Sequence, residues 1–122
     1  MIYTVTLNPS LDYLVQTDRL RPGRLCRIHG ETLRPGGKGV NVSLVCAALS
    51  LSTRALGFIA GGTGALFASL LAETGVEYDF CRLGRGMTRI NVKVCAREQT
   101  ELNGAGPDIP ADALEKLAAS LD

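Results

Sequence analysis

Short runs of alternating apolar and polar residues make up the first part of the chain. Residues 2–7 alternate β-branched with other apolar side chains and predict a strand, which Asn-Pro-Ser at 8–10 ends. The runs that follow are shorter and more polar, and a turn at 21–23 (Arg-Pro-Gly) divides them. They predict three more short strands, at 12–16, 25–28 and 31–33.

The period changes to that of a helix after a cluster of glycines at 34–39. Apolar positions 40, 44, 45, 48 and 49 share one helical face. A short strand is expected at 53–56, followed by a glycine-rich loop at 57–64. Residues 65–74 predict a second helix, which Gly75 ends.

The remaining segments predict strands and a final helix. Strands are expected at 76–81 and 87–96, and a hairpin partner for the second at 99–103. In the second strand, Ile90, Val92 and Val94 face one way. Pro110 suits a helix start, and 111–121 predicts a helix with neither a cap nor a stop signal. We therefore expect the chain to be an interrupted, incomplete fold.

The order of these elements predicts the fold class. Strand, glycine turn and helix recur in an order that is typical of an α/β fold with a mainly parallel sheet flanked by helices. The short polar strands at about 12–33 and 87–103 do not fit this rhythm, and they predict a small β-strand lid layer beside the sheet. We expect residues 1–122 to form the N-terminal part of one domain.

Composition narrows the classes of function. The 122 residues are 46% hydrophobic and 20% charged, which is typical of globular proteins. A net charge of +1 is too small an excess of positive charge to indicate binding to nucleic acid or to an anionic membrane. The most apolar stretch, 40–51, is too short to span a bilayer, and the first residues do not resemble a signal peptide. We therefore expect a cytoplasmic protein without nucleic-acid or membrane partners.

The cysteines do not indicate a metal site. None of the four forms a Cys-x-x-Cys pair, and none is close in sequence to the only histidine, His29. Reduced, mostly buried thiols are the expected state.

The most specific local signal is Gly-Gly-Lys-Gly-Val-Asn at 36–41. Glycines allow the backbone to approach a ligand closely, and the helix that follows directs free amides and its positive dipole end at the loop. A phosphate or a polar sugar hydroxyl suits such a place. The spacing matches neither a Walker A loop nor a dinucleotide-binding fingerprint, which disfavours nicotinamide and flavin enzymes. A plain turn is the alternative interpretation.

Several motifs together resemble the PfkB (ribokinase-like) carbohydrate kinases, in order and in spacing. They are Asn-Pro-Ser-Leu-Asp at 8–12, Pro-Gly-Gly-Lys-Gly-Val-Asn-Val-Ser at 35–43 and Gly-Phe-Ile-Ala-Gly-Gly-Thr-Gly at 57–64. Thr-Arg-Ile-Asn-Val-Lys at 88–93 and Thr-Glu-Leu-Asn-Gly-Ala-Gly-Pro at 100–107 are similar to the 1-phosphofructokinase and tagatose-6-phosphate kinase branch. The resemblance covers the N-terminal portion of a family member. Ala60 departs from it, because the family usually has a glycine at or beside this position.

The resemblance implies a set of substrate-binding residues. Asp12 would bind sugar hydroxyls, with a turn-capping aspartate as the alternative. The loop and helix start would hold the sugar through Gly36, Gly37, Lys38 and Asn41.

Two arginines complete the implied site. Arg89 would bind the phosphate that the substrate already carries, because guanidinium suits bidentate phosphate contacts. A solvated strand residue is the alternative for Arg89. Arg27 lies in the segment that resembles the lid, where a basic residue would reach the substrate of a neighbouring subunit; surface charge is the alternative. Glu101 and Asn103 match the branch without an assigned role.

The resemblance also implies the reaction. The intact enzyme would use ATP and Mg²⁺ to phosphorylate a ketose phosphate, most simply fructose 1-phosphate to fructose 1,6-bisphosphate, and would form a homodimer through the lid strands. The catalytic aspartate and the ATP site belong to the family's second half, so we expect no catalytic residue and no turnover from these 122 residues. Gly-Ala-Gly-Pro at 104–107 is interpreted as a turn, not as the catalytic motif. The alternatives are a tagatose-6-phosphate kinase, another PfkB sugar kinase, or a non-catalytic sugar-phosphate-binding or dimerising fragment.

Overall fold

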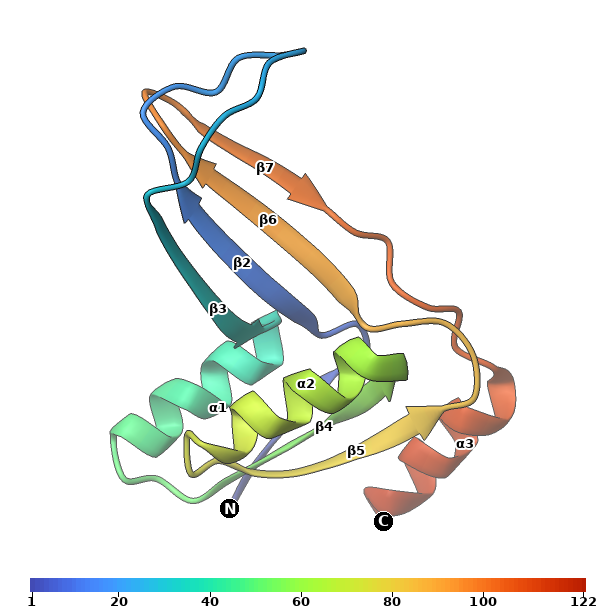
Figure 1. Cartoon of the computed structure of the whole chain (residues 1–122). Helices are drawn as coiled ribbons and strands as arrows, with labels where there is room; N and C mark the ends of the chain where they lie inside the picture. The colour runs from blue at the N-terminus through green and yellow to red at the C-terminus, as the bar shows by residue number, and fades with distance from the viewer.

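A computed structural model describes all residues, 1–122, and shows two sheets and three helices (Figure 1). The first sheet is parallel and has the order β1-β4-β5, with β1 at Ile2–Thr6, β4 at Thr53–Ala60 and β5 at Glu77–Leu83. The central strand β4 is the most buried element, as expected for a parallel strand covered on both faces. The predicted α/β class is confirmed.

Helices cover both faces of this sheet because alternate residues of β4 point to opposite sides. Ala55 and Ile59 pack on the side of α1 (Lys38–Ala48) and α2 (Gly61–Ala72), in a cluster that contains Phe67 and Leu71. On the other side, Leu56, Phe58 and Ala60 pack against α3 (Ala111–Ser120) through Ala113 and Leu117.

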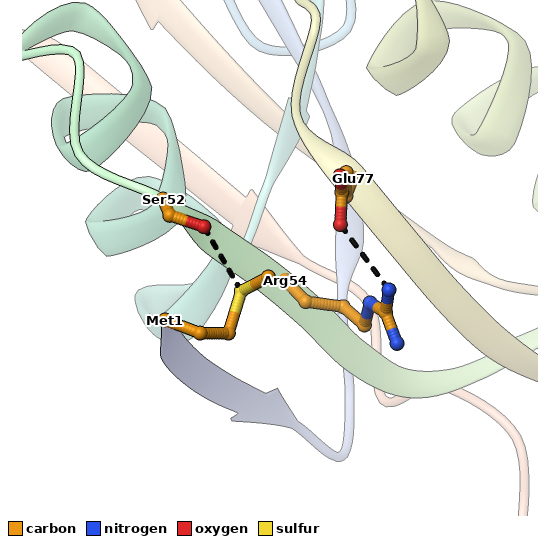
Figure 2. Close-up of polar contacts among 4 residues, drawn as sticks. All are labelled: Met1, Ser52, Arg54 and Glu77. Carbon is orange, nitrogen blue, oxygen red and sulfur yellow. Dashed lines mark hydrogen bonds and ion pairs between the residues drawn. The ribbon is translucent and has the colours of Figure 1, made fainter.

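Polar contacts join the amino ends of the parallel strands (Figure 2). The hydroxyl of Ser52 donates to the sulfur of Met1 over 3.4 Å. Arg54 pairs with Glu77 on the neighbouring strand β5, with 3.3 Å between guanidinium nitrogen and carboxylate oxygen. Both groups of that pair are well exposed, so the pair contributes at most about 1 kcal/mol.

The second sheet is the predicted lid layer, and it rises away from the layered part of the molecule (Figure 1). Its order is β3-β2-β6-β7: β2 is Ser10–Gln16, β3 is Gly30–Gly36, β6 is Arg89–Cys95 and β7 is Gln99–Asn103. Strands β2 and β6 run parallel, and the two outer pairs are antiparallel. The predicted hairpin of residues 87–103 is confirmed. Leu11, which is 1% exposed, anchors the lid in the core cluster of α1 and α2.

The strand register gives the lid a polar face and an apolar face. Asp12 lies opposite Arg34 and Asn91, and Lys93 lies opposite Glu101, so these side chains share one face. The other face carries Tyr13, Val15, Leu33, Ile90, Val92, Val94 and Leu102. The predicted common face of the three β6 residues 90, 92 and 94 is therefore confirmed.

Two predicted elements are wrong. Residues 25–28 form no strand; they belong to the irregular segment between β2 and β3. Residues 57–64 form no loop, because β4 continues to Ala60 and α2 begins at Gly61. Gly57 serves a close approach of strands: a Cβ there would lie 2.0 Å from the carbonyl oxygen of Thr6 in β1.

The apolar positions of α1 do not mark its buried side. Val40 is buried, but Val45 and Leu49 are 58% and 66% exposed, whereas Ser43 and Cys46 are buried. The reason is a buried hydroxyl chain: Ser43 lies 2.7 Å from the hydroxyl of Thr4 and 2.9 Å from that of Thr53. These bonds satisfy the buried hydroxyls of Thr4 and Thr53, and they fix which side of α1 meets the sheet.

No helix of the structure has both the length and the apolar character to cross a bilayer.

Candidate functional site

The candidate site lies where the two sheets meet, at the carboxyl ends of the parallel strands (Figure 1). Strand β1 continues into β2 there, and α2 begins directly after β4. The start of α1 reaches the same place, because a Cβ at Gly37 would lie 2.7 Å from the Thr6 methyl group and 3.3 Å from the Pro9 Cα. In open α/β sheets, ligands bind outside the carboxyl ends of the strands.

Asp12 lies in the middle of this junction, on the polar face of the lid. Its Oδ1 accepts a 2.7 Å hydrogen bond from the Ser10 hydroxyl and a 3.4 Å hydrogen bond from the Asn91 amide. Its carboxylate lies against Gly36, where a Cβ would come within 2.2 Å of Oδ2. Oδ2 itself accepts none of the hydrogen bonds within the chain, so it is available to a ligand hydroxyl. Asp12 is thus a mid-strand residue and not a turn cap.

The glycine loop joins β3 to α1 and brings the helix start to Asp12. Gly37 has φ of +122°, a conformation that side chains disfavour, and it precedes the first helical residue. The first hydrogen bond of the helix runs from the Asn41 amide to the Gly37 carbonyl, over 2.8 Å. No side chain caps the preceding amides, and no acidic residue lies in the first turn. The helix start therefore presents unpaired donors and the positive end of its dipole.

Lys38 and Asn41 lie in the first turn of α1, and both are exposed. Neither side chain takes part in a hydrogen bond or an ion pair within the chain. They lie at the helix start, beside the glycine loop, with their polar groups free to contact a ligand.

Arg89 is the first residue of β6, and it lies directly opposite Ser10 in the register. Its Nε donates to the Asn8 carbonyl over 3.2 Å, and its Nη1 donates to the Gly104 carbonyl over 3.4 Å. A guanidinium has five N–H donors, so three remain for a ligand. These bonds rule out a freely solvated strand arginine, and in the register Arg89 lies two residues along β6 from Asn91, the partner of Asp12.

Arg27 is not brought to these residues. It lies in the irregular segment between β2 and β3, at the tip of the lid, whereas Asp12 and Gly36 lie toward the base (Figure 1). Its backbone carbonyl accepts a 2.8 Å hydrogen bond from the Thr17 hydroxyl, and its side chain is exposed.

The sequence patterns missed the amides that connect the predicted residues. Asn91 is 8% exposed, and its Oδ1 accepts a 3.1 Å hydrogen bond from the Gly104 amide. Asn8 donates from Nδ2 to the Ala105 carbonyl over 2.9 Å. One signal was present: polar residues at alternate positions of β2 and β6, Ser10 with Asp12 and Arg89 with Asn91, place both pairs on one face.

The remaining charged groups add little to the chemistry of the site. No three His, Cys, Asp or Glu side chains gather in the chain. A shifted pKa occurs on the other face of the lid, where the hydrogen bond that Tyr13 donates to Glu31 raises the pKa of the Tyr13 hydroxyl. The site therefore has the means to bind a hydroxylated anion: one carboxylate, one anchored guanidinium and free helix amides.

Comparisons with known proteins agree with this chemistry. A model of the pfkB family of carbohydrate kinases matches residues 6–120. The chain is 46% identical over 109 residues to a 1-phosphofructokinase of Bacillus subtilis, covering 89% of the chain and 36% of that relative. It is 36% identical over 117 residues to a D-tagatose-1-phosphate kinase of Bacillus licheniformis, covering 96% of the chain and 38% of that relative.

Solved structures show the same relation. The structure of phosphofructokinase-2 from Escherichia coli in complex with fructose-6-phosphate has a TM-score of 0.90 and 32% identity, covering 98% of this chain and 40% of that one. A tetrameric inhibited form of the same protein has a TM-score of 0.88. The chain thus spans well under half the length of the proteins it matches, and the fold is incomplete. These matches confirm the resemblance that the motifs indicated.

Proposed function

Because the chain belongs to the PfkB family of carbohydrate kinases, we propose that the whole protein transfers the γ-phosphoryl group of ATP to a ketose phosphate. Fructose 1-phosphate is the substrate that we propose, with fructose 1,6-bisphosphate as the product. The relative with 46% identity, a 1-phosphofructokinase, supports this choice. In this proposal the 122 residues supply the part of the enzyme that binds the sugar.

One observation carries the proposal: a carboxylate, an anchored guanidinium and the free amides of a helix start meet on the polar base of the lid. Asp12 orients sugar hydroxyls through its free Oδ2. Arg89 binds the phosphate already present, using the donors that its two backbone contacts leave free. The sugar lies against the start of α1, where the binding groups are Gly36, Gly37, Lys38 and Asn41.

Phosphoryl transfer depends on positioning and on charge stabilisation more than on covalent chemistry. The residues described above position the acceptor. PfkB kinases use ATP, and kinases in general use Mg²⁺, which would stabilise the charge of the phosphates. In the family that the motifs resemble, the ATP site and the catalytic base belong to the second half, so we assign these groups and the Mg²⁺ ligands to residues outside this chain. The 122 residues alone are then expected to be inactive.

A tagatose phosphate is the second candidate substrate, because a D-tagatose-1-phosphate kinase is 36% identical to this chain. Fructose and tagatose 1-phosphates differ at one carbon and carry the same phosphate. The role assigned to Arg89 is therefore the same for either substrate.

A homodimer through the apolar face of the lid is part of the proposal. Leu102 is 61% exposed on that face, and a cavity of about 270 Å³ beside Tyr13, Val92 and Val94 is lined almost wholly by apolar side chains. Burial of such a face against a second copy would stabilise it. The tip of the lid carries Arg27, which in such a dimer would approach the site of the partner subunit.

All four cysteines are free thiols, which suits the cytoplasm, where we place the protein.

Replacing Arg89 tests the phosphate-binding role. In the protein expressed from its complete reading frame, Arg89→Ala should raise the KM for fructose 1-phosphate by about 10- to 100-fold, the effect of losing charge-assisted hydrogen bonds. The KM for unphosphorylated fructose should change far less, because fructose has no group for the guanidinium to bind. Steady-state kinetics with both sugars provide the comparison.

Arg54→Ala is the matched control. Arg54 lies at the opposite, amino end of β4, where it pairs with Glu77 (Figure 2), so both KM values should keep their original size. An equal rise of KM for the sugar and for the sugar phosphate in the Arg89 variant would refute the proposed role.

A further inference from the structure

We infer that Asn91 is a positioning residue that couples the hydroxyl-binding carboxylate of Asp12 to the phosphate-binding guanidinium of Arg89. The inference rests on the proposed function, because it concerns the same sugar-phosphate site. It adds a residue that the motif comparison left without a role.

The two ends of the Asn91 carboxamide contact two different parts of the site. Nδ2 donates to Asp12 Oδ1 over 3.4 Å, and Oδ1 accepts from the Gly104 amide over 3.1 Å. Asn91 is 8% exposed and occupies the position on β6 directly opposite Asp12. A buried amide with both ends paired is costly to rearrange, so it fixes the side chains that it contacts.

The chemistry of the partners fixes which way the carboxamide points. The Gly104 amide is a donor, so the Asn91 atom that faces it must be the oxygen. The nitrogen then faces Asp12 and meets an acceptor, as an ionised carboxylate requires. The reversed orientation would oppose donor to donor and acceptor to acceptor. Asn91 therefore presents a donor to Asp12 and favours one rotamer of that side chain.

Gly104 carries the coupling on to Arg89. The same residue that donates its amide to Asn91 offers its carbonyl to Arg89 Nη1 over 3.4 Å. A Cβ at Gly104 would lie 3.1 Å from the Arg89 Cβ and 3.1 Å from the Ile90 carbonyl oxygen, so the close approach depends on glycine. The hydrogen bonds thus run without a gap from Ser10 through Asp12, Asn91 and Gly104 to the guanidinium.

Other charged groups face Asp12 from the neighbouring elements. Arg34 lies directly opposite on β3, Arg89 and Lys93 lie one pair away along β6, and Glu101 is the partner of Lys93 on β7. All of them are present in the unmodified protein as well. A pH effect that appears only after a change at position 91 therefore reports on the pair of residues 12 and 91.

Asn91→Asp is the most informative change, because it keeps the shape and the acceptor for the Gly104 amide. It replaces the donor that faces Asp12 with a second carboxylate oxygen, and two carboxylates at this distance share a proton. In the protein expressed from its complete reading frame, the KM for fructose 1-phosphate at about pH 8 should rise about tenfold or more, the effect of losing one hydrogen bond to a charged group. Toward about pH 5.5 a shared proton restores the donor, so the ratio of this KM to that of the unmodified protein should fall.

The KM for ATP should stay within about twofold of the unmodified protein at every pH, because Asn91 contacts only groups on the sugar side. In Asn91→Ser the side chain is too short to contact Asp12 or the Gly104 amide. This variant should raise the KM for the sugar phosphate at all pH values, without recovery in acid. Thermal unfolding shows whether each variant is folded. Should Asn91→Asp not fold, the serine variant decides: a KM that rises for the sugar phosphate but not for ATP supports the inference, whereas an unchanged KM or an equal rise of both KM values overturns it.

Two results would overturn the inference with folded Asn91→Asp. One is a KM for the sugar phosphate equal to that of the unmodified protein throughout; the other is a uniform rise that acid does not reverse, which a purely structural role would give. Failure of the proposed function is recognised separately, because Arg89→Ala would then leave the KM for the sugar phosphate unchanged, whatever the Asn91 variants do.

Discussion

The contact between Asp12 and Gly36 shows why a glycine ends β3. The two residues lie on adjacent strands, and the carboxylate occupies the volume that a Cβ at position 36 would need, 2.2 Å from Oδ2 and 2.7 Å from Cγ. The obstacle is the far end of a side chain and not backbone, so a methyl group would displace the carboxylate more easily than the strand. Gly36 therefore serves the site more than the stability of the fold.

Gly36→Ala should separate binding from folding. We expect the displaced carboxylate to raise the KM for the sugar phosphate by about tenfold or more, because a charged hydrogen-bonding group is lost from the sugar. The free energy of unfolding should fall by about 1–2 kcal/mol at most, since only a side-chain end must move. Kinetics and denaturant unfolding measure the two quantities.

Gly62→Ala is the matched control in α2. A Cβ there would have nothing within 4 Å, so we expect unchanged kinetics and a gain of about 0.5–1 kcal/mol from the restricted backbone. A Gly36 variant with unchanged KM would show that the carboxylate position does not matter to the substrate.

At the scale of residues, the sequence predicted the end members of the site and missed the middle. Asp12, Arg89 and the glycine loop follow from motifs in a fixed order along the chain. Asn91 and Gly104 also lie in quoted motifs, at 88–93 and 100–107, but the motifs do not indicate their roles, because these depend on the register between β2, β6 and β7. A one-residue slip in that register would turn Asn91 to the apolar face. The pattern of residues within a single strand does not specify this register.

At the scale of elements, the lid is a sheet with one polar and one apolar face. Its polar face carries Asp12 and Asn91, whereas its apolar face is covered only in part: Val15 and Val94 are buried, but Ile90 is 39% and Leu102 61% exposed. The base of the apolar face is covered, because Leu11 inserts into the core beneath α1 and α2. The uncovered part is the surface that we assign to the dimer.

Leu102→Lys should disrupt that dimer. Leu102 is exposed within one chain, so a lysine there should change the free energy of unfolding of the monomer by no more than about 0.5 kcal/mol. In an apolar interface the charge would be buried without a partner, which is strongly unfavourable. Sedimentation velocity of the full-length protein should therefore show a dimer before the change and a monomer after it.

Gln99→Lys on the same strand tests which face of the lid forms the dimer. Gln99 belongs to the polar face and is exposed, so the same new charge should leave the dimer intact. If Leu102→Lys sediments as a dimer while Gln99→Lys does not, the wrong face has been assigned to the interface.

The elements that the sequence predicted best are those with a clear period and a clear end. Strand β1, helix α3 and the hairpin of β6 and β7 match their expected bounds to within a few residues. Glycines caused the main error at residues 57–64, because they usually mark turns but here allow β1 and β4 to approach. The apolar pattern of α1 does not reveal its buried side, because buried hydroxyl contacts at Ser43 orient the helix.

At the scale of the whole molecule, the two sheets are joined so that the lid stands over the carboxyl ends of the parallel strands (Figure 1). Three of the four connections to the lid join the first sheet or α1 at that edge: Asn8 before β2, Gly37 after β3 and Thr88 before β6. The Thr88 hydroxyl accepts a 3.0 Å hydrogen bond from the Ala60 amide, and the Thr88 amide donates a 3.0 Å hydrogen bond to the Ala60 carbonyl. These two bonds tie β6 to the start of α2. The groups that we propose to bind the sugar are therefore tied to the first sheet at their base.

A crystal structure of the full-length protein with fructose 1-phosphate tests the central claim most directly. We predict that the substrate phosphate lies within hydrogen-bonding distance of the free Arg89 nitrogens, and that at least one sugar hydroxyl donates to Asp12 Oδ2 at the start of α1. A sugar phosphate bound away from the base of the lid, or bound there with its phosphate turned away from Arg89, would contradict the account.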